Sequence, residues 1–338
     1  MTRATLMKAI TRTALAAVVA AGMAAPAAAE THTVRLAQQF GLLYLPLNVV
    51  LAKKLIQKHA KTLGIAAPKV ELYTISGGAN IDKALLAKTI DFGAAGIAPA
   101  LKLWGATKGR FKVAFDMTHM PLKLVTNDPH VKTLQDYLTV KNDKIATPAA
   151  KVSLQAVVLE MAAERLWHQP DRLDHLVVSM KHPTAMAAIL SGGQEVKSHF
   201  STLPYSYEEL KSGKVHEVTN SYKLLGGEHS TLVMIAGKEF KDENPKLYKA
   251  VCDAFLESYK WIYEHPSEAS EIFIKATRSK LDPATVKALI SNKNEIHYTD
   301  QPEKTMLFAK FLHSTGDIPE AKSWKDYYWD NNYNLKGS

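Results

Sequence analysis

Short apolar runs alternate with amphipathic segments along most of the chain. Runs rich in β-branched and aromatic residues predict strands at residues 32–37 (HTVRLA), 69–75 (KVELYTI), 89–95 (TIDFGAA) and 111–117 (FKVAFDM). Apolar residues at three- and four-residue spacing predict helices between them, at residues 46–59, 81–88 and up to 101. Strands that alternate with helices in this way favour a parallel sheet covered by helices on both faces.

The same alternation restarts in the middle of the chain. A strand at residues 121–126 (PLKLVT) ends in an Asn-Asp-Pro turn, and a short helix follows at 134–138. We expect further strands at residues 144–147, 173–179 and 196–200, and helices at 153–166 and 183–190. A second α/β unit is therefore nested inside the first.

The end of the chain is mostly helical. A strand at residues 230–236 (STLVMIA) precedes segments with helical spacing at 246–263, 267–276, 283–291 and 303–314. Because a chain of 338 residues exceeds what one core usually organises, we expect two lobes. The chain would cross between them at residues 115–126 and 226–234, and two crossovers form a hinge around a cleft.

The first 29 residues have the order of a secretory signal peptide. Arg3, Lys8 and Arg12 form a basic start, residues 14–22 (ALAAVVAAG) a short apolar run, and residues 24–29 (AAPAAA) a small-residue cleavage region. The apolar run is shorter than the roughly 20 residues that a membrane span needs. We therefore expect export, with Glu30 as the first mature residue; a plain N-terminal extension is the alternative.

Charge and cysteine content narrow the class of protein. The formal net charge is +9, but the lysines are scattered, which argues against nucleic-acid binding and gives a mild positive field that favours anionic ligands. Cys252 is the one cysteine, so no internal disulfide forms, and its apolar neighbours indicate core packing. No second stretch approaches transmembrane length, so the mature protein is not expected to be membrane-inserted.

Motifs for catalysis, metals and cofactors are missing from the sequence. There is no G-x-S-x-G, P-loop or G-x-G-x-x-G, and the 13 histidines form no H-E-x-x-H. Glu160, Glu164 and His168 share one predicted helix face, but charged residues there more often form a solvent-exposed face. We expect no enzyme activity, no catalytic residue, no cofactor and no metal.

Six segments, taken in order, carry a resemblance to a known family. They are VRLAQQFGLLYLPLNVVLAKKL, VELYTISGGANIDKALLAKTIDFGAAGIAPAL, LKLVTNDPHVKTLQD, KIATPAAKVSLQAVVLEMAAERL, HPTAMAAILSGGQEVKSHFSTLP and EFKDENPKLYKAVCDAFLESYKWIYEHPSEASEIFIK. Together they resemble the periplasmic binding proteins of the nitrate, alkanesulfonate and taurine importers. That fold is shared with the fungal enzymes that make the pyrimidine part of thiamine, which depend on a cysteine-rich motif that this chain lacks.

This resemblance implies a type II periplasmic-binding-protein fold, with two α/β lobes, a hinge of two crossovers and a ligand cleft. Lobe 1 would combine residues 30–120 and 230–338, and lobe 2 would be residues 121–229. It also implies a periplasmic monomer whose partners are the permease and ATPase subunits of an ABC importer. The segment SGGQEVKSHFSTLP lacks the Asp and the Trp-Glu-Pro often found there in the family, which leaves the ligand class open.

Candidate ligand-binding residues follow the strands of lobe 1, because ligands of open α/β sheets lie at the carboxyl ends of strands. Glycines let backbone N–H groups turn toward an anion at a helix start, although a plain turn is the alternative. Gln side chains can donate and accept, and aromatic rings can form an apolar wall or pack in the core. The candidates are Gln38, Gln39, Phe40, Tyr44, Ser76, Gly77, Gly78, Asn80, Gly96 and Ile97.

The crossovers and lobe 2 supply the remaining candidates, which are His119, Thr147, Ser153, His199, Phe200 and Glu228. Ser153 also has the character of a helix N-cap, His119 is equally compatible with a solvated or locally bonded position, and a carboxylate such as Glu228 is more often simply solvated. The preferred function is capture of a small anion, such as a sulfonate, nitrate or carboxylate. The alternatives are a pyrimidine or similar vitamin precursor stacked on Phe40, Tyr44 and Phe200, a ligand sensor for a membrane kinase, and a periplasmic enzyme on the same scaffold.

Overall fold

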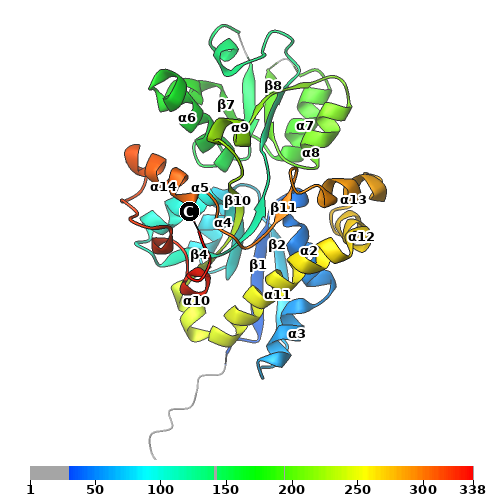
Figure 1. Ribbon diagram of the computed structural model, residues 1–338, viewed down its shortest axis with the longest axis vertical. Coiled ribbons are helices and arrows are strands. Elements are labelled where there is room, and N and C mark those ends of the chain that lie inside the picture. The colour runs from blue at the N-terminus through cyan, green and yellow to red at the C-terminus, as the bar shows by residue number, and fades with distance from the viewer. Residues whose placement is uncertain (1–29, 141–142, 194, 338) are drawn as a thin grey trace, which may run out of the picture. The chain divides into compact units, whose positions relative to one another are not determined.

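The computed structural model describes residues 30–140, 143–193 and 195–337. The predicted signal peptide at residues 1–29 lies outside the described residues. Two sheets organise the chain from Thr31 onward (Figure 1). The first has the strand order β11-β4-β10-β3-β1-β2 and contains β1 (Thr33–Gln38), β2 (Lys69–Thr74), β3 (Phe92–Gly96), β4 (Phe111–His119), β10 (Ser230–Gly237) and β11 (His297–Tyr298).

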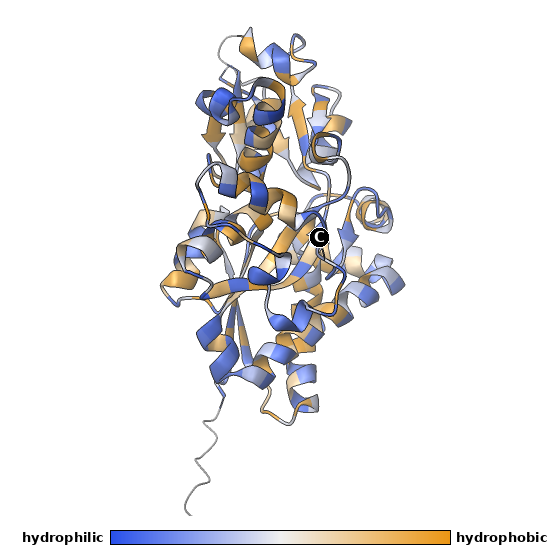
Figure 2. Cartoon of the chain, turned by 60° about the vertical axis from the view of Figure 1, so that its left-hand side comes forward, coloured by the Kyte–Doolittle hydropathy of each residue, from blue (hydrophilic) through white to orange (hydrophobic). Residues whose placement is uncertain are grey.

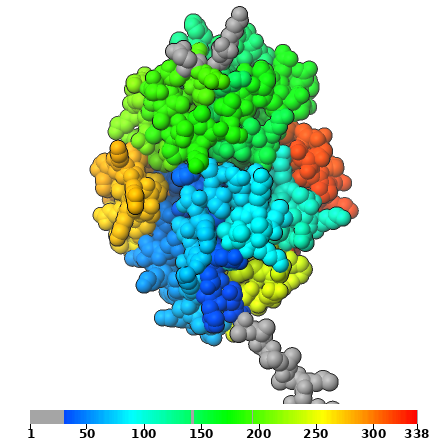
Figure 3. Space-filling view, turned by 180° about the vertical axis from the view of Figure 1, so that it is seen from behind, coloured from blue at the N-terminus to red at the C-terminus, as the bar shows by residue number. Residues whose placement is uncertain are grey.

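The second sheet comes from the middle of the chain and has the order β7-β6-β8-β5-β9. Its strands are β5 (Lys123–Thr126), β6 (Lys144–Thr147), β7 (Val177–Ser179), β8 (Val196–Ser201) and β9 (His216–Asn220). Each sheet with its helices forms one α/β lobe. Seen from behind, the green residues of the second sheet's part of the chain gather together against the blue and cyan residues of the first (Figure 3).

Helices cover both sheets. Those of the first lobe are α2 (Leu45–Ala52), α3 (Leu55–Thr62), α4 (Gly78–Leu86), α5 (Ile97–Ala106), α10 (Lys238–Glu243), α11 (Pro245–Glu264), α12 (Pro266–Thr277), α13 (Pro283–Ser291) and α14 (Thr305–Ser314). Those of the second are α6 (Leu154–Trp167), α7 (His182–Leu190), α8 (Tyr205–Lys211) and α9 (Ser221–Leu225). Short 3₁₀ helices are η1 (Leu42–Tyr44), η2 (Leu134–Leu138), η3 (Pro170–Leu176), η4 (Trp324–Asp326) and η5 (Asp330–Asn332).

The apolar pattern explains where the strands lie. All eight residues of β10 are buried, as expected for a strand covered on both faces, and hydrophobic strands lie in the middle of the first sheet (Figure 2). The helix α11 buries a stripe that includes Leu247, Val251 and Phe255, with polar residues on its other side. Among the described residues, no helix is long and apolar enough to cross a membrane.

Three expectations about the elements were wrong in part. Both sheets are mixed, because β10 runs antiparallel to β3 and β4, and β5 runs antiparallel to β8 and β9. The expected helix at 46–59 is two helices, separated at Lys54, whose φ of 53° is left-handed. Most of the expected strand at 173–179 is the 3₁₀ helix η3, which begins at Pro170, and only β7 is extended.

Two connections join the sheets. Strand β4 continues into β5 through residues 120–122, and β9 returns through α9 and residues 226–229 to β10. The connections are hydrogen-bonded to each other: the Met120 N–H donates to Thr231 Oγ1 at 3.0 Å, and the Leu122 N–H donates to Ser221 Oγ at 2.9 Å. The paired connections form a short two-stranded link at the predicted crossover positions.

Candidate functional site

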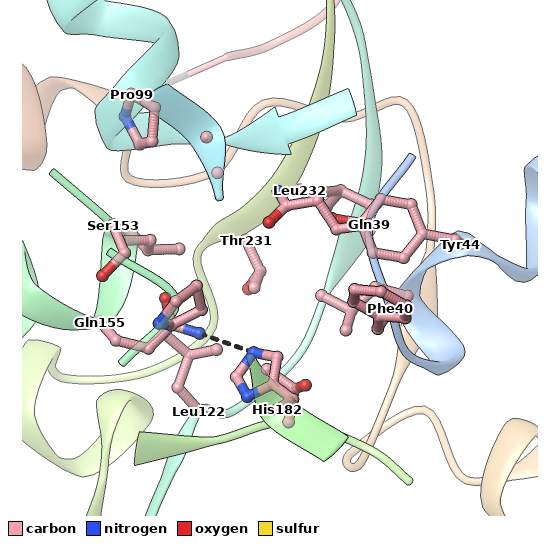
Figure 4. Close-up of a pocket in the computed structure, with 16 residues that line it drawn as sticks. Gln39, Phe40, Tyr44, Pro99, Leu122, Ser153, Gln155, His182, Thr231 and Leu232 are labelled. Carbon is pink, nitrogen blue, oxygen red and sulfur yellow. Dashed lines mark hydrogen bonds between the residues drawn. The ribbon is translucent and has the colours of Figure 1, made fainter. Parts of the chain in front are cut away.

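The carboxyl ends of parallel strands from both sheets surround one hollow of about 460 Å³ (Figure 4). Strands β1, β2 and β3 run parallel in the first lobe, and β6, β7 and β8 run parallel in the second. The hollow, called the pocket below, is lined by Gln39, Phe40, Leu43, Tyr44, Gly78, Gly96, Pro99, Leu122, Pro148, Ser153, Leu154, Gln155, His182, Thr202, Thr231 and Leu232.

The loop after β1 forms one wall of the pocket. Gln39 reaches across to the next loop, where its Oε1 accepts a hydrogen bond from the Gly77 N–H at 2.8 Å. Gly77 has a φ of 83°, a left-handed conformation that favours glycine, so the turn into α4 depends on it. Phe40 and Tyr44 provide the aromatic surface, and burial raises the pKa of the Tyr44 hydroxyl far above its ordinary value, so that it stays neutral.

Two glycines allow helix starts to approach their neighbours closely. A Cβ on Gly78 would lie 2.6 Å from Pro99 Cγ, so only glycine lets α4 begin against α5. A Cβ on Gly96 would lie 2.9 Å from the Cβ of Leu154, which belongs to the other lobe. The first glycine therefore serves packing within the first lobe, whereas the second permits contact between the two lobes.

The second lobe contributes the start of α6. Ser153 is its N-cap, and the Ser153 Oγ accepts from the Ala156 N–H at 3.3 Å. Gln155, in the first turn, lies beside His182 with 3.4 Å between Gln155 Nε2 and His182 Nε2 (Figure 4). The pocket thus receives an amide and an imidazole from adjacent helix starts.

Behind His182 lies a series of buried polar groups. His182 Nδ1 lies 2.7 Å from His199 Nε2, and His199 Nδ1 lies 2.6 Å from Glu209 Oε1. Burial lowers the pKa of His182 well below its ordinary value and that of His199 to about 3, so both rings are neutral at physiological pH. Burial likewise raises the pKa of Glu209 to about 8.

Four helices point their N-termini at the pocket. Gly78 and His182 are the first residues of α4 and α7, while Gly96 and Ser153 are the N-caps of α5 and α6. The start of a helix carries unpaired N–H groups and a partial positive charge, which together favour anions. None of the lining residues is Asp, Glu, Lys or Arg. The pocket therefore offers hydrogen-bond donors and positive potential without a fixed counter-charge.

One lining hydroxyl lacks a partner. Thr202 follows β8, is 3% exposed, and its Oγ1 is buried without a hydrogen bond. A buried polar atom without a partner is costly, and it is commonly satisfied by a ligand or water. Thr202 is therefore the lining side chain with an unused capacity to bind.

A larger hollow of about 1320 Å³ adjoins the pocket and shares Gln39, Phe40 and Tyr44 with it. Gln38 lines this outer hollow, together with Arg278 and Lys280 from the segment after α12. The three shared side chains consequently separate the pocket from a space that also contains basic residues.

Six of the sixteen predicted residues line the pocket: Gln39, Phe40, Tyr44, Gly78, Gly96 and Ser153. Five more lie in or near the same loops without lining it. The Asn80 Nδ2 donates to the Ser76 carbonyl at 2.8 Å, and the Gly77 N–H donates to Gln39 Oε1. Ile97 is fully buried at the start of α5. Gln38 lies in the outer hollow.

Three predicted residues of the second lobe are buried behind the pocket. His199 contacts His182 rather than the pocket itself. Phe200 is fully buried in the hydrophobic core, because successive side chains of β8 alternate between faces. Thr147 is fully buried, and its Oγ1 has no hydrogen-bond partner.

His119 and Glu228 belong to a separate cluster at the crossovers. Glu228 Oε1 lies 2.7 Å from His119 Nδ1 and 2.8 Å from His297 Nδ1. On its other side, His119 Nε2 lies 3.2 Å from Asp116 Oδ2. The ligand atoms of His119, Glu228 and His297 lie within 4.8 Å of one another, a spacing that could hold a metal ion. The hydrogen bonds to one shared carboxylate oxygen already account for this arrangement.

Sequence reasoning missed Leu43, Pro99, Leu122, Pro148, Leu154, Gln155, His182, Thr202, Thr231 and Leu232. Gln155 and His182 follow strands by the same rule that identified Ser153, so extending the rule to the first helical turn would have found them. Thr202 follows β8 directly and was available to the same argument. The apolar members carry no signal that separates them from core residues.

No protein-family model and no curated protein matches the sequence. Solved structures are similar at the level of the fold. The alkanesulfonate-binding protein SsuA from Xanthomonas axonopodis pv. citri, bound to MOPS, has a TM-score of 0.69 and 16% identity, covering 89% of this chain and 99% of that chain. The periplasmic aliphatic sulphonate binding protein SsuA from Escherichia coli has a TM-score of 0.65 and 16% identity, covering 89% and 93%.

The periplasmic nitrate-binding protein NrtA from Synechocystis PCC 6803 is similar in the same way. Its TM-score is 0.67 at 15% identity, and the match covers 90% of this chain and 88% of that chain. All three matches cover about nine tenths of this chain. The chain therefore has the two-lobed α/β fold of the periplasmic binding proteins.

Proposed function

We propose that this protein is the solute-binding component of an ABC importer and captures a small anion in the pocket between its lobes. The observation that carries the proposal is the convergence of four helix N-termini on a pocket whose lining has no carboxylate. Helix starts are ready-made anion sites, because their free N–H groups and their dipoles act together. The solved structures with this fold include sulfonate- and nitrate-binding proteins, which supports the same ligand class.

We further propose that lobe 1 comprises residues 30–120 with 230–338, and lobe 2 residues 121–229. Ligand capture would be a closure of these lobes about the two crossovers, because only the closed state presents donors from both sides. Direct contacts between the lobes support this: the Leu42 N–H donates to the Leu203 carbonyl at 2.8 Å, and Lys102 Nζ donates to the Lys151 carbonyl at 3.0 Å.

Capture without catalysis is part of the proposal. The Ser153 hydroxyl oxygen caps α6, and His182 faces Gln155 and His199, so no hydroxyl of the lining is hydrogen-bonded to the imidazole. A nucleophile needs a base within hydrogen-bond reach. The remaining parts of the proposal are export by the signal peptide at residues 1–29, a periplasmic location, a monomeric state, and a permease and an ATPase as partners.

The experiment is a thermal-shift screen of the chain from residue 30, followed by calorimetry of the hits. The panel contains alkanesulfonates, nitrate, carboxylates and pyrimidines. A ligand at about 100 times its dissociation constant should add about 2.7 kcal/mol to the free energy of unfolding. A shift with pyrimidines alone would overturn the anion proposal in favour of stacking on Phe40 and Tyr44. Shifts with none of these compounds would overturn it as well.

Thr202→Val tests whether the bound anion uses this pocket. Valine keeps the shape of threonine but removes the hydroxyl, whose hydrogen bond to a charged group is worth about 1.5–3 kcal/mol. We expect calorimetry to show affinity reduced by about tenfold or more, with little loss of stability because the hydroxyl has no partner in the protein. Thr62→Val, at an exposed position at the end of helix α3, is the matched control and should bind normally. Equal affinity in both variants would place the anion elsewhere.

A further inference from the structure

Three contacts in series connect the pocket to a buried carboxyl group in the second lobe. They join Gln155 Nε2 to His182 Nε2, His182 Nδ1 to His199 Nε2, and His199 Nδ1 to Glu209 Oε1, at 3.4, 2.7 and 2.6 Å. Gln155 and His182 line the pocket and are 6% and 7% exposed, while His199 and Glu209 are fully buried. The series comes from three separate elements, α7, β8 and α8, besides Gln155 on α6.

While both imidazole rings are neutral, the hydrogens of this series can be placed in only two ways. Each contact needs one hydrogen, and a neutral imidazole carries a hydrogen on one nitrogen and a lone pair on the other. If Glu209 is ionised, His199 Nδ1 must donate to it, so His199 Nε2 must accept from His182 Nδ1. The His182 Nε2 atom is then an acceptor at the pocket, and the Gln155 Nε2–H donates to it.

One additional proton reverses the two inner contacts. A protonated Glu209 donates to His199 Nδ1, His199 Nε2–H donates to His182 Nδ1, and His182 Nε2–H becomes a donor at the pocket. The Gln155 amide nitrogen only donates, so in this state Gln155 must turn its amide oxygen toward His182 or leave the Nε2–H to a ligand. The number of protons on the series thus decides whether His182 Nε2 donates a hydrogen bond to a ligand or accepts one from it.

We propose that His182, His199 and Glu209 form a proton relay that links anion capture to one proton held on the relay. The inference rests on the proposed function and deepens it, because it names the group that selects the ligand's charge. The protonated relay offers a donor and favours an anion such as a sulfonate or nitrate. The deprotonated relay offers a lone pair that repels an anion. Glu209 contacts no ligand and acts as a positioning residue through two imidazoles.

The environment of Glu209 favours the protonated form. Its Oε2 is buried without a hydrogen-bond partner, and among the described residues its one ion-pair contact is His199. A fully buried carboxylate without a charged partner is strongly disfavoured, so the neutral acid is the stable form. Burial raises the pKa of Glu209 to about 8, which the nearby Ser201 hydroxyl counteracts only in part.

The other titratable groups around the relay come from the same region of the second lobe. Glu208, the neighbour of Glu209 on α8, is half-buried, and its negative charge adds to the repulsion of an ionised Glu209. Tyr205 stacks on His182 with ring centroids 5.8 Å apart, and burial raises its pKa to about 12. Tyr205 stays neutral and Glu208 adds negative charge, so neither of these two neighbours supplies a positive charge that would stabilise an ionised Glu209.

The relay is tested without a ligand by nitrogen NMR of the ¹⁵N-histidine-labelled protein between pH 6 and 10. We expect His182 and His199 to remain neutral and to exchange tautomers together, with one shared midpoint. Glu209→Gln should abolish the exchange, because an amide does not ionise, and the matched control Glu208→Gln should preserve it. Tautomers that stay unchanged across this range in the wild type, or that still exchange in Glu209→Gln, would overturn the relay.

Calorimetry with nitrate and ethanesulfonate, which stay ionised throughout this range, gives the functional readout. Above the relay's midpoint, the affinity of the wild type and of Glu208→Gln should fall about tenfold per pH unit, because each binding event then requires uptake of one proton. The affinity of Glu209→Gln should be independent of pH. A tautomer exchange without binding of any anion would contradict the proposed function but not the relay. Anion binding whose affinity does not change with pH in the wild type would contradict the relay but not the proposed function.

Discussion

His119 is a buried imidazole that joins the two crossovers. It ends β4, lies between Asp116 and Glu228, and is 2% exposed. Burial opposes its charged form, but the hydrogen bonds and charges of the two carboxylates more than offset this and raise the pKa of His119 to about 9. The hydrogen bond from His119 is the main reason that the pKa of Glu228 falls to about 2. The crossovers are therefore tied by an ion pair.

The folded pKa of His119 lies above its ordinary value of 6.5, which fixes the sign of the pH dependence. Its contribution to the free energy of unfolding is complete below about pH 6.5 and is lost as pH rises through about 9. Urea denaturation at pH 6 and pH 10 measures how far the free energy of unfolding falls between these two pH values. We expect this decrease to be smaller in His119→Gln than in the wild type by on the order of 3 kcal/mol. His130→Gln, an exposed control, should retain it. An identical pH dependence in both variants would contradict the ion pair.

At the scale of elements, alternation in the sequence predicted most strands and helices but not their directions. Periodicity records which face of a strand is buried, and the direction of β10 depends on where the chain returns from the second sheet. The missed elements are short or half-buried: every residue of β9 is of intermediate exposure, and β11 has two residues. Such segments bury too little apolar surface to leave a pattern.

The candidate site was predictable at the positions where the backbone conformation determines the residue type. Glycines and an N-cap after strands identified Gly78, Gly96 and Ser153, because those residue types are needed for helix starts and close approach. His182 was missed because the rule was not extended to the first turn of the helix that follows β7, although it starts α7. Phe200 was assigned to the cleft, but it faces the core.

Gly96→Ala tests the contact between helices α5 and α6. The backbone at Gly96 is extended, with φ −63° and ψ 156°, so alanine fits it without strain. The new methyl would lie 2.9 Å from Leu154 Cβ in the other lobe, and overpacking of this kind typically costs about 1–3 kcal/mol. We expect calorimetry to show anion affinity reduced by about fivefold to a hundredfold, with thermal stability of the free protein nearly unchanged.

A second substitution, Leu154→Gly, makes this test specific. It removes the Cβ that the new methyl would meet, so the double variant should recover part of the affinity lost in Gly96→Ala. A bulkier residue at Gly78 is a poorer test, because its Cβ would collide with Pro99 within the first lobe. Strictly additive effects of the two substitutions would exclude a shared contact in the ligand-bound state.

At the scale of the whole molecule, two lobes connected by paired crossovers can act as a hinge only if the lobes themselves stay rigid. Each sheet has its own buried strands, and the crossovers are hydrogen-bonded to each other through Thr231 and Ser221. Polar contacts between the described parts of the two lobes include Lys123 with Glu295 and Glu228 with His119 and His297, besides hydrogen bonds to second-lobe carbonyls from the Leu42 N–H, Lys102 Nζ and Lys304 Nζ. Bending should therefore concentrate at the crossovers.

Spin labels on the two lobes can measure this closure. Cys252 is buried and its pKa is raised to about 12, so it should resist labelling and can be left in place. We expect Asp317→Cys with Asp171→Cys, one in each lobe, to show a distance that shortens by about 2 Å or more when a saturating anion is added. The hinge predicts this because the ligand gains donors from both lobes only in the closed state.

A second pair of labels separates hinge closure from a general tightening. Asp317→Cys with Lys61→Cys places both labels in the first lobe, and this distance should not change with ligand. Gly96→Ala should hold the interlobe distance near its ligand-free value even at saturation, since its methyl obstructs the approach of Leu154. An anion that binds tightly while the interlobe distance stays constant would show that the pocket is preformed and that closure plays no part in capture.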